Sequence, residues 1–119
     1  MQSETGQRGE DCATKYLESY GYKICERNFR TPFGELDIVC RKENVIIFVE
    51  VKTLKENANG FTPELHFTEN KMQKMQRTIR AYLKDRRVIG TDYQLDLVAV
   101  ELKGNSEVKD VRHYENITM

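Results

Sequence analysis

Two acidic residues in neighbouring apolar segments of this sequence have a spacing that could hold a metal ion. The segments 34–41 and 45–52 each alternate apolar and polar residues, so both predict β-strands, and the turn at 42–44 predicts a hairpin. If the apolar positions of both strands share one face, Asp37 lies opposite Glu50. Directly opposed Cβ atoms are about 4.5–5.5 Å apart, so two carboxylates would meet on the polar face.

The predicted register also fixes the neighbours of this acidic pair. It places Glu35 opposite Lys52, Val39 opposite Phe48 and Arg41 opposite Ile46, with Leu36, Ile38 and Cys40 on the apolar face. Opposed like charges are destabilising unless a proton, a lysine or a divalent cation lies between them.

Mg²⁺ (or Mn²⁺) suits such a pair, because it takes oxygen ligands and is often held by one or two carboxylates plus a substrate phosphate. Lys52 follows Glu50 by two residues on the same side of the strand, where it could orient or deprotonate a water molecule. The alternative is a surface cluster of ion pairs in which Lys52 and Arg41 neutralise the two acids. The pattern alone leaves both interpretations open.

A third acidic residue, Glu10, lies in a first predicted helix from about 5 to 20, on the same stripe as Ala13 and Leu17. A carboxylate on the core side of a helix is costly unless it is paired or bound to a cation. Glu10 is also close to the helix start, where the helix dipole and solvent would stabilise it. Helix position by itself slightly favours this second interpretation.

The remaining pattern predicts further strands at 22–30, 93–101 and 108–115, a polar loop at 54–66, and a second helix at 68–86. The second helix has a buried stripe formed by Met72, Met75, Ile79, Tyr82 and Leu83. The order is αβββαβ with a final edge strand, which predicts an α/β fold with a mixed sheet. At 119 residues, the chain is expected to form a single domain spanning residues 1–119.

The charge of the chain is neutral overall but uneven. Nineteen basic residues balance nineteen acidic ones, whereas residues 67–90 hold seven basic and two acidic side chains. This surplus predicts either a phosphate-binding face or an ordinary solvated helix face. The candidate nucleic-acid contacts on this helix are Lys71, Lys74, Arg77, Arg80 and Lys84.

The composition argues against a membrane protein, because no apolar run approaches the roughly 18 residues that a membrane span requires. The N-terminal residues show no secretory signal pattern. Three cysteines at spacings that match no zinc site predict reduced thiols in a cytoplasmic protein.

Four other residues have candidate or structural roles. Arg30 could touch a phosphate, although a surface arginine is the commoner case. Asp96 is expected to be structural, His66 to be solvated in the long loop, and His113 has no partner that the sequence identifies.

The acidic pair also supports a resemblance. Asp37, twelve intervening residues and then Glu50-Val51-Lys52 resemble the PD-(D/E)XK nuclease motif. The whole chain resembles the YraN family of small bacterial proteins, which are similar to Holliday-junction resolvases. The matching segments are Gly9-Glu10 with Ala13 and Tyr16-Leu17, 27–30, 34–39, 48–52, Lys71, 81–83, 95–100 and 113–116.

The resemblance implies a restriction-endonuclease-like αβββαβ core with a central mixed sheet flanked by helices. It implies that Asp37, Glu50 and the Val51 carbonyl bind Mg²⁺ or Mn²⁺, that Lys52 is catalytic, and that Glu10 joins the metal site. Glu35 would contact these ligands without binding the metal itself. The chain departs from the family pattern at Leu54, where an arginine is common, and at Gln94-Leu95-Asp96, which replaces Arg-Phe-Asp.

These observations lead to three hypotheses about function. The first is a Mg²⁺-dependent endonuclease that hydrolyses DNA phosphodiester bonds, at branched or recombination structures if a two-fold homodimer presents two sites. The second is a nucleic-acid-binding module of the same fold without catalysis. The third is a protein-interaction adaptor, for which no protein partner is identified, with the acidic pair as a surface feature.

Overall fold

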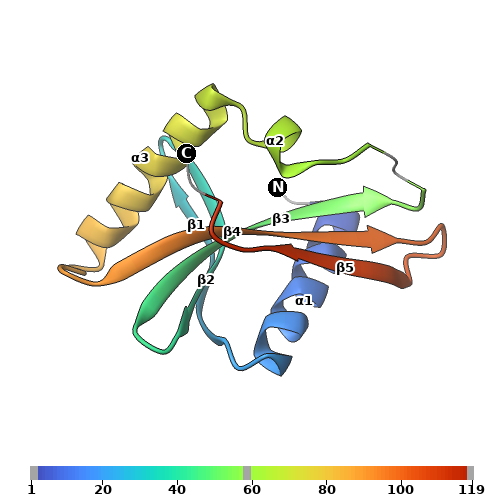
Figure 1. The fold of residues 1–119 in the computed structure, drawn as a ribbon, viewed down its shortest axis with the longest axis horizontal. Coiled ribbons are helices and arrows are strands. Elements are labelled where there is room, and N and C mark those ends of the chain that lie inside the picture. Colours follow the sequence, from blue (N-terminus) through green and yellow to red (C-terminus); the bar gives the residue numbers. More distant parts are fainter. Residues whose placement is uncertain (1–2, 58–59, 118–119) are drawn as a thin grey trace.

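The computed structural model describes residues 3–57 and 60–117, which form a five-stranded sheet with helices on both faces (Figure 1). The predicted α/β fold with a mixed sheet is therefore confirmed. The elements are α1 (Glu4–Ser19), β1 (Lys23–Thr31), β2 (Gly34–Lys42), β3 (Val45–Lys55), α2 (Pro63–His66), α3 (Glu69–Asp85), β4 (Asp92–Leu102) and β5 (Val108–Tyr114).

The strand order follows the chain, β1-β2-β3-β4-β5, and only the β3–β4 pair is parallel. Parallel neighbours need a long crossover connection, which the segment containing α2 and α3 supplies. Because of this crossover, α3 covers the face of the sheet opposite α1 (Figure 1).

Both long helices begin at the capping residues that their sequences provide. Ser3 accepts a hydrogen bond from the backbone N–H of Gly6, and Thr68 accepts one from the backbone N–H of Lys71. At the other end of α1, Gly21 adopts φ +87°, a left-handed conformation that glycine takes without steric cost. The predicted helices at 5–20 and 68–86 are thus confirmed to within a residue or two.

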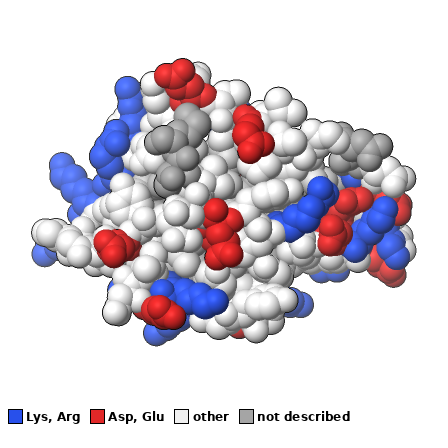
Figure 2. All heavy atoms as spheres, viewed as in Figure 1, with Lys and Arg blue, Asp and Glu red and all other residues white. Residues whose placement is uncertain are grey.

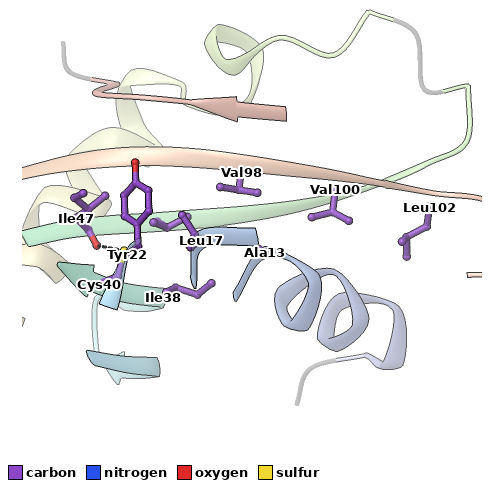
Figure 3. Packing of buried hydrophobic residues seen from close by; sticks show 10 residues of the cluster. Ala13, Leu17, Tyr22, Ile38, Cys40, Ile47, Val98, Val100 and Leu102 are labelled. Atoms are coloured by element: carbon purple, nitrogen blue, oxygen red, sulfur yellow. Dashed lines mark hydrogen bonds between the residues drawn. The ribbon is translucent and has the colours of Figure 1, made fainter. Parts of the chain in front are cut away.

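A hydrophobic core fills each side of the sheet. On the α1 side, Ala13 and Leu17 pack against Ile38, Val98 and Val100 (Figure 3). On the α3 side, Met72, Ile79 and Tyr82 pack against strand residues that include Phe48 and Leu97. The predicted α3 stripe is therefore confirmed, although Met75 and Leu83 are only partly buried and Thr78, which was not predicted, is buried.

The three cysteines are free thiols, as predicted, and only Cys40 is buried. Among the residues that the structure describes, no helix combines the length and the apolar character needed to cross a lipid bilayer.

The β2–β3 hairpin has the predicted register but a shorter extent. Val39 pairs with Phe48 and Arg41 with Ile46, as expected, and the turn is only two residues long because Lys42 pairs with Val45. The pairing ends at Ile38 and Val49.

The face of Leu36 was predicted wrongly. Leu36 packs in the α3 core, whereas Ile38, two residues later, packs in the α1 core. On the neighbouring strand, Arg27 contacts α1 whereas Phe29 packs on Tyr82 of α3. Between them, Asn28 has φ +55°, a left-handed conformation that asparagine tolerates better than most residues, and it changes the side to which the strand's side chains point.

The segment 54–66 was predicted as loop throughout, but β3 continues to Lys55 and α2 occupies its end. Thr62 caps α2 by accepting from the backbone N–H of Leu65, and Pro63 occupies the first helical position. This Thr-Pro-Glu sequence is a helix-start signal that could have been recognised.

Gly9 lets α1 approach β3 closely, because a Cβ added at this position would overlap Thr53 Oγ1 and lie 3.1 Å from Thr53 Cβ. We predict that Gly9→Ala lowers the free energy of unfolding by about 1–3 kcal/mol through overpacking, despite the better helix propensity of alanine. Chemical denaturation would measure this change. A Gly9→Ala/Thr53→Ala double variant should recover part of the loss, and additive effects of the two substitutions would contradict the contact.

Candidate metal and nucleic-acid site

The candidate site lies where β2 and β3 stop pairing. Beyond Ile38 and Val49, a side chain replaces the backbone acceptor of the ladder: the Val51 N–H donates to Asp37 Oδ2 at 2.8 Å. A backbone N–H that loses its strand partner must find another acceptor if it is not solvated. The strand divergence therefore holds the Asp37 carboxyl against the Glu50-Val51-Lys52 segment.

Asp37 and Glu50 meet as the sequence predicts. Their side chains share a hydrogen bond, which two ionised carboxylates cannot form without a proton between them. Burial first, and then the hydrogen bond and charge of Glu50, raise the pKa of Asp37 well above its usual range. Without a cation, this pair therefore holds a proton at neutral pH.

His66 joins the pair from the end of α2. Its Nε2 lies 3.4 Å from Glu50 Oε2, and its side chain is only 15% exposed, so the expectation of a solvated loop histidine is wrong. Burial and the positive charges of Lys71 and Lys52 lower the pKa of His66. The positive charges of both lysines therefore act on this imidazole.

The acidic pair is not a surface cluster of ion pairs. Within the described part of the chain, no ion pair joins Asp37 or Glu50 to Lys52 or Arg41, and His66 is the only basic group paired with either acid. Lys52 is half-buried, two residues after Glu50 on the same strand, and forms no ion pair with either acid.

Glu10 is buried rather than solvated. Its side chain is 1% exposed, and the Arg27 guanidinium donates to Glu10 Oε1 at 3.3 Å and to Asp11 Oδ1 at 2.8 Å. Solvent therefore does not stabilise this carboxylate, whereas Arg27 does. The close approach at Gly9 brings Glu10 to the α1 side of β3. Whether Glu10 joins a metal site stays a prediction.

Glu35 and Arg30 are paired with each other, and a contact of Arg30 with phosphate stays a prediction. They are partners in the β1–β2 ladder, and Arg30 Nε lies 3.1 Å from Glu35 Oε2. The expected opposition of Glu35 and Lys52 is wrong, because the β2–β3 ladder ends before it. The Glu35 charge contributes to the raised pKa of Asp37, so Glu35 influences the pair from a distance.

Asn28 is a residue that the sequence analysis missed. It lies on β1 between Arg27 and Phe29, whose ladder partners Ile38 and Leu36 flank Asp37. Its Oδ1 is buried and has no hydrogen-bond partner among the described residues. A buried polar atom of this kind is usually satisfied by water or an ion.

These donors fit a small divalent cation. Two carboxylates that already share a proton could exchange it for a metal ion, and the His66 nitrogen is a further donor beside Glu50. Asp37 and Glu50 could therefore hold Mg²⁺ or Mn²⁺. The Val51 carbonyl as a third ligand stays a prediction.

A row of basic side chains lies along α3. Figure 2 shows Lys and Arg atoms along the edge that α3 forms, and others at the opposite end and at the bottom among acidic ones; all five predicted contact residues of α3 are exposed. They form no ion pair with any described carboxylate, so their charges are available to an anion. These residues are Lys71, Lys74, Arg77, Arg80 and Lys84.

Asp96 and His113 belong to a separate hydrogen-bond network. Asp96 is fully buried and accepts hydrogen bonds from Gln94 Nε2 and the Asn116 N–H, and it contacts His113 Nε2 at 2.7 Å. His113 Nδ1 in turn lies 3.2 Å from the Tyr16 hydroxyl. The partner of His113 is thus the Asp96 carboxylate, between β4 and β5. Together with Glu115, these two residues could offer a metal ion three ligand atoms that all lie within 4.8 Å of one another, so a purely structural role for Asp96 stays a prediction.

Comparison with known proteins fits this architecture. A family profile described as "Uncharacterised protein family UPF0102" matches residues 9–100, which include Glu10, Asp37 and the Glu50–Lys52 segment. The chain belongs to the UPF0102 family. UPF0102 is the YraN family, so the resemblance stated from the sequence is confirmed.

Relatives in the UPF0102 family match along most of their length. The UPF0102 protein of Sulfurihydrogenibium sp. strain YO3AOP1 is 38% identical over 96% of this chain and 93% of its own. Those of Syntrophomonas wolfei and Syntrophotalea carbinolica are 38% and 39% identical, over 93% and 92% of this chain and 96% and 86% of their own.

The acidic pair should cost stability when no cation is present. Asn at position 37 keeps an acceptor for the Val51 N–H and gains a donor toward Glu50, so it imitates protonated Asp37. A shift of one pKa unit is worth about 1.4 kcal/mol. We therefore predict that Asp37→Asn raises the free energy of unfolding at pH 8 in chelator by about 1 kcal/mol or more.

The pH dependence tests the cause of this gain. Because the folded-state pKa of Asp37 is raised, the wild type binds more protons folded than unfolded, and its stability falls as pH rises above about 4. The advantage of Asp37→Asn should therefore grow from pH 5 to pH 8, measured by urea denaturation. Asp92→Asn, at an exposed position, is the control. An advantage independent of pH would contradict the shared proton.

Proposed function

We propose that this protein is a metal-dependent endonuclease that hydrolyses DNA phosphodiester bonds. The observation that supports this proposal is the contact between the Asp37 and Glu50 carboxyls, held at a strand end beside Lys52 and His66. A fold alone does not determine function, so the proposal depends on this local chemistry.

The cation that this pair could hold would supply Lewis-acid stabilisation of the charge that develops on the phosphate. The Val51 N–H holds Asp37 at the strand end, and Glu50 lies against His66, so each carboxylate has a partner that orients it. Lys52, the residue after Val51, is the group that would orient or deprotonate the attacking water.

The α3 face would bind the DNA backbone. Lys71 lies near His66 at the acidic pair, and Lys74, Arg77 and Arg80 continue along the exposed side of the helix. Contacts between such cations and phosphates position DNA without reading its sequence. A backbone held along α3 would therefore pass the acidic pair at the first turn of the helix.

The alternative is a nucleic-acid-binding module that does not catalyse hydrolysis. Such a module needs the α3 cations. It gains nothing from an acidic pair close to the bound phosphates, in which the pKa of Asp37 is raised. The cost in stability of that pair in the free protein is the specific feature that favours the nuclease.

Cleavage of linear, flapped and four-way DNA in Mg²⁺ or Mn²⁺ tests the proposal. We predict that the wild type cleaves at least one of these substrates, and that Lys52→Ala and Asp37→Asn each reduce the rate about 100-fold or more. Lys15→Ala removes the same charge from the exposed side of α1 and should leave the rate unchanged.

The outcomes separate the two candidates. Binding without cleavage across all substrates and both metals would contradict the nuclease and favour the binding module. Cleavage that survives in both site variants would show that the activity comes from elsewhere or from a contaminant.

A further inference from the structure

An open hollow of about 810 Å³ separates the β1–β2 turn from the C-terminal half of α3. One aromatic side chain, Phe33, lines it from the turn, and cationic side chains line it from the helix. The lining residues are Phe33, Arg77, Arg80, Ala81, Lys84, Asp85 and Arg87.

Phe33 lies in a hydrogen-bonded turn and is exposed to solvent. The Thr31 hydroxyl accepts hydrogen bonds from the N–H groups of Phe33 and Gly34, at 3.1 and 3.2 Å, and Pro32 restricts the preceding residue. The Phe33 side chain is 51% exposed, whereas nearby Phe29 packs edge-to-face on Tyr82 with ring centroids 5.0 Å apart. The turn therefore presents a free aromatic face instead of burying it.

The cations around this ring are not neutralised. Within residues 3–57 and 60–117, no carboxylate pairs with Arg77, Arg80, Lys84 or Arg87. The one acidic residue of the hollow, Asp85, pairs with Arg86, which also binds Glu26 at 2.7 Å. The hollow therefore combines an exposed ring with a net positive charge.

Two elements connect the hollow with the acidic pair. On β2, Phe33 precedes Asp37 by four residues, a distance of about 13 Å along an extended strand. On α3, the basic residues run from Lys71, near His66, toward the hollow. The two elements are in contact, because a Cβ added at Gly34 would lie 3.0 Å from Thr78 Oγ1.

We propose that this hollow binds a single-stranded segment of the DNA substrate, with an unpaired base stacked on Phe33 and its phosphates held by the surrounding cations. An aromatic face can stack on any exposed base, whereas the bases within a duplex are already stacked on each other. The inference rests on the proposed function and names its substrate: DNA with an unpaired stretch about 13 Å from the cut.

Binding measured by fluorescence anisotropy in chelator, where no cleavage occurs, tests this inference. Three probes of equal length are used: a blunt duplex, the same duplex with an unpaired tail, and the single strand alone. We predict that the wild type prefers the two probes with unpaired bases. Phe33→Leu should weaken their binding about tenfold and leave the blunt duplex unchanged, because base stacking is worth roughly 1–3 kcal/mol.

Matched variants distinguish stacking from charge and from misfolding. Phe33→Tyr keeps an aromatic face and should bind like the wild type, and Tyr20→Leu removes an exposed ring from the other side of the sheet without effect. Arg77→Ala with Arg80→Ala should weaken all probes and lower the slope of log affinity against log salt by about 2. Unchanged unfolding midpoints show that the variants are folded.

The possible failures are distinguishable. If Phe33→Leu binds every probe like the wild type, or weakens duplex and tailed probes equally, the stacking site is wrong while the proposed function stands. If the wild type binds no probe even at low salt, both the stacking site and DNA as the substrate are overturned. Loss of cleavage with intact, Phe33-dependent tail binding would contradict only the proposed catalysis.

Discussion

The hydrogen bond from the Val51 N–H to the Asp37 carboxyl is the contact on which the rest of the site depends. It forms because β2 and β3 pair only as far as Ile38 and Val49, so a backbone donor of β3 needs a new acceptor. A side chain at the strand end fills that need, and it brings a carboxyl against Glu50. The end of the β2–β3 pairing thus produces both the hydrogen bond from Val51 to Asp37 and the unfavourable contact between two carboxyls.

The surrounding elements place hydrogen-bond donors and cations around the acidic pair without neutralising it. The left-handed Asn28 turns β1 so that Arg27 reaches Glu10 on one side of the sheet and Phe29 reaches α3 on the other. The parallel pairing of β3 and β4 requires a crossover connection. This connection contains His66, which contacts Glu50, and α3, whose basic side lies at the edge of the site. The acidic pair is therefore surrounded by donors and cations but is not neutralised by an ion pair with Lys52 or Arg41.

Periodicity predicted most of this fold. Alternating apolar residues predicted the β2–β3 register, and the apolar stripes predicted both long helices. The juxtaposition of Asp37 and Glu50 was predictable for the same reason, because a slip of one residue would turn a whole strand over.

The errors arose where a residue departs from regular geometry or depends on a distant contact. An alternating pattern assumes an ideal strand, so it could not show that Asn28 reverses the faces of β1 and β2 and moves Leu36 to the other core. His66 and His113 lie far in sequence from Glu50 and Asp96, so no spacing rule connects them. The burial of Glu10 follows from the Gly9–Thr53 approach, which only tertiary packing shows.

Binding of Mn²⁺ to the wild type and its site variants, followed by calorimetry and by the thermal unfolding midpoint, tests the central claim most directly. If the acidic pair is a cation site, Mn²⁺ stabilises the wild type in a saturable way, by about 2.7 kcal/mol at 100 times its dissociation constant. Asp37→Asn and Glu50→Gln should lose this stabilisation, whereas the exposed Asp92→Asn should keep it. Equal stabilisation of the wild type and both site variants would contradict the assignment, because the cation would then bind elsewhere.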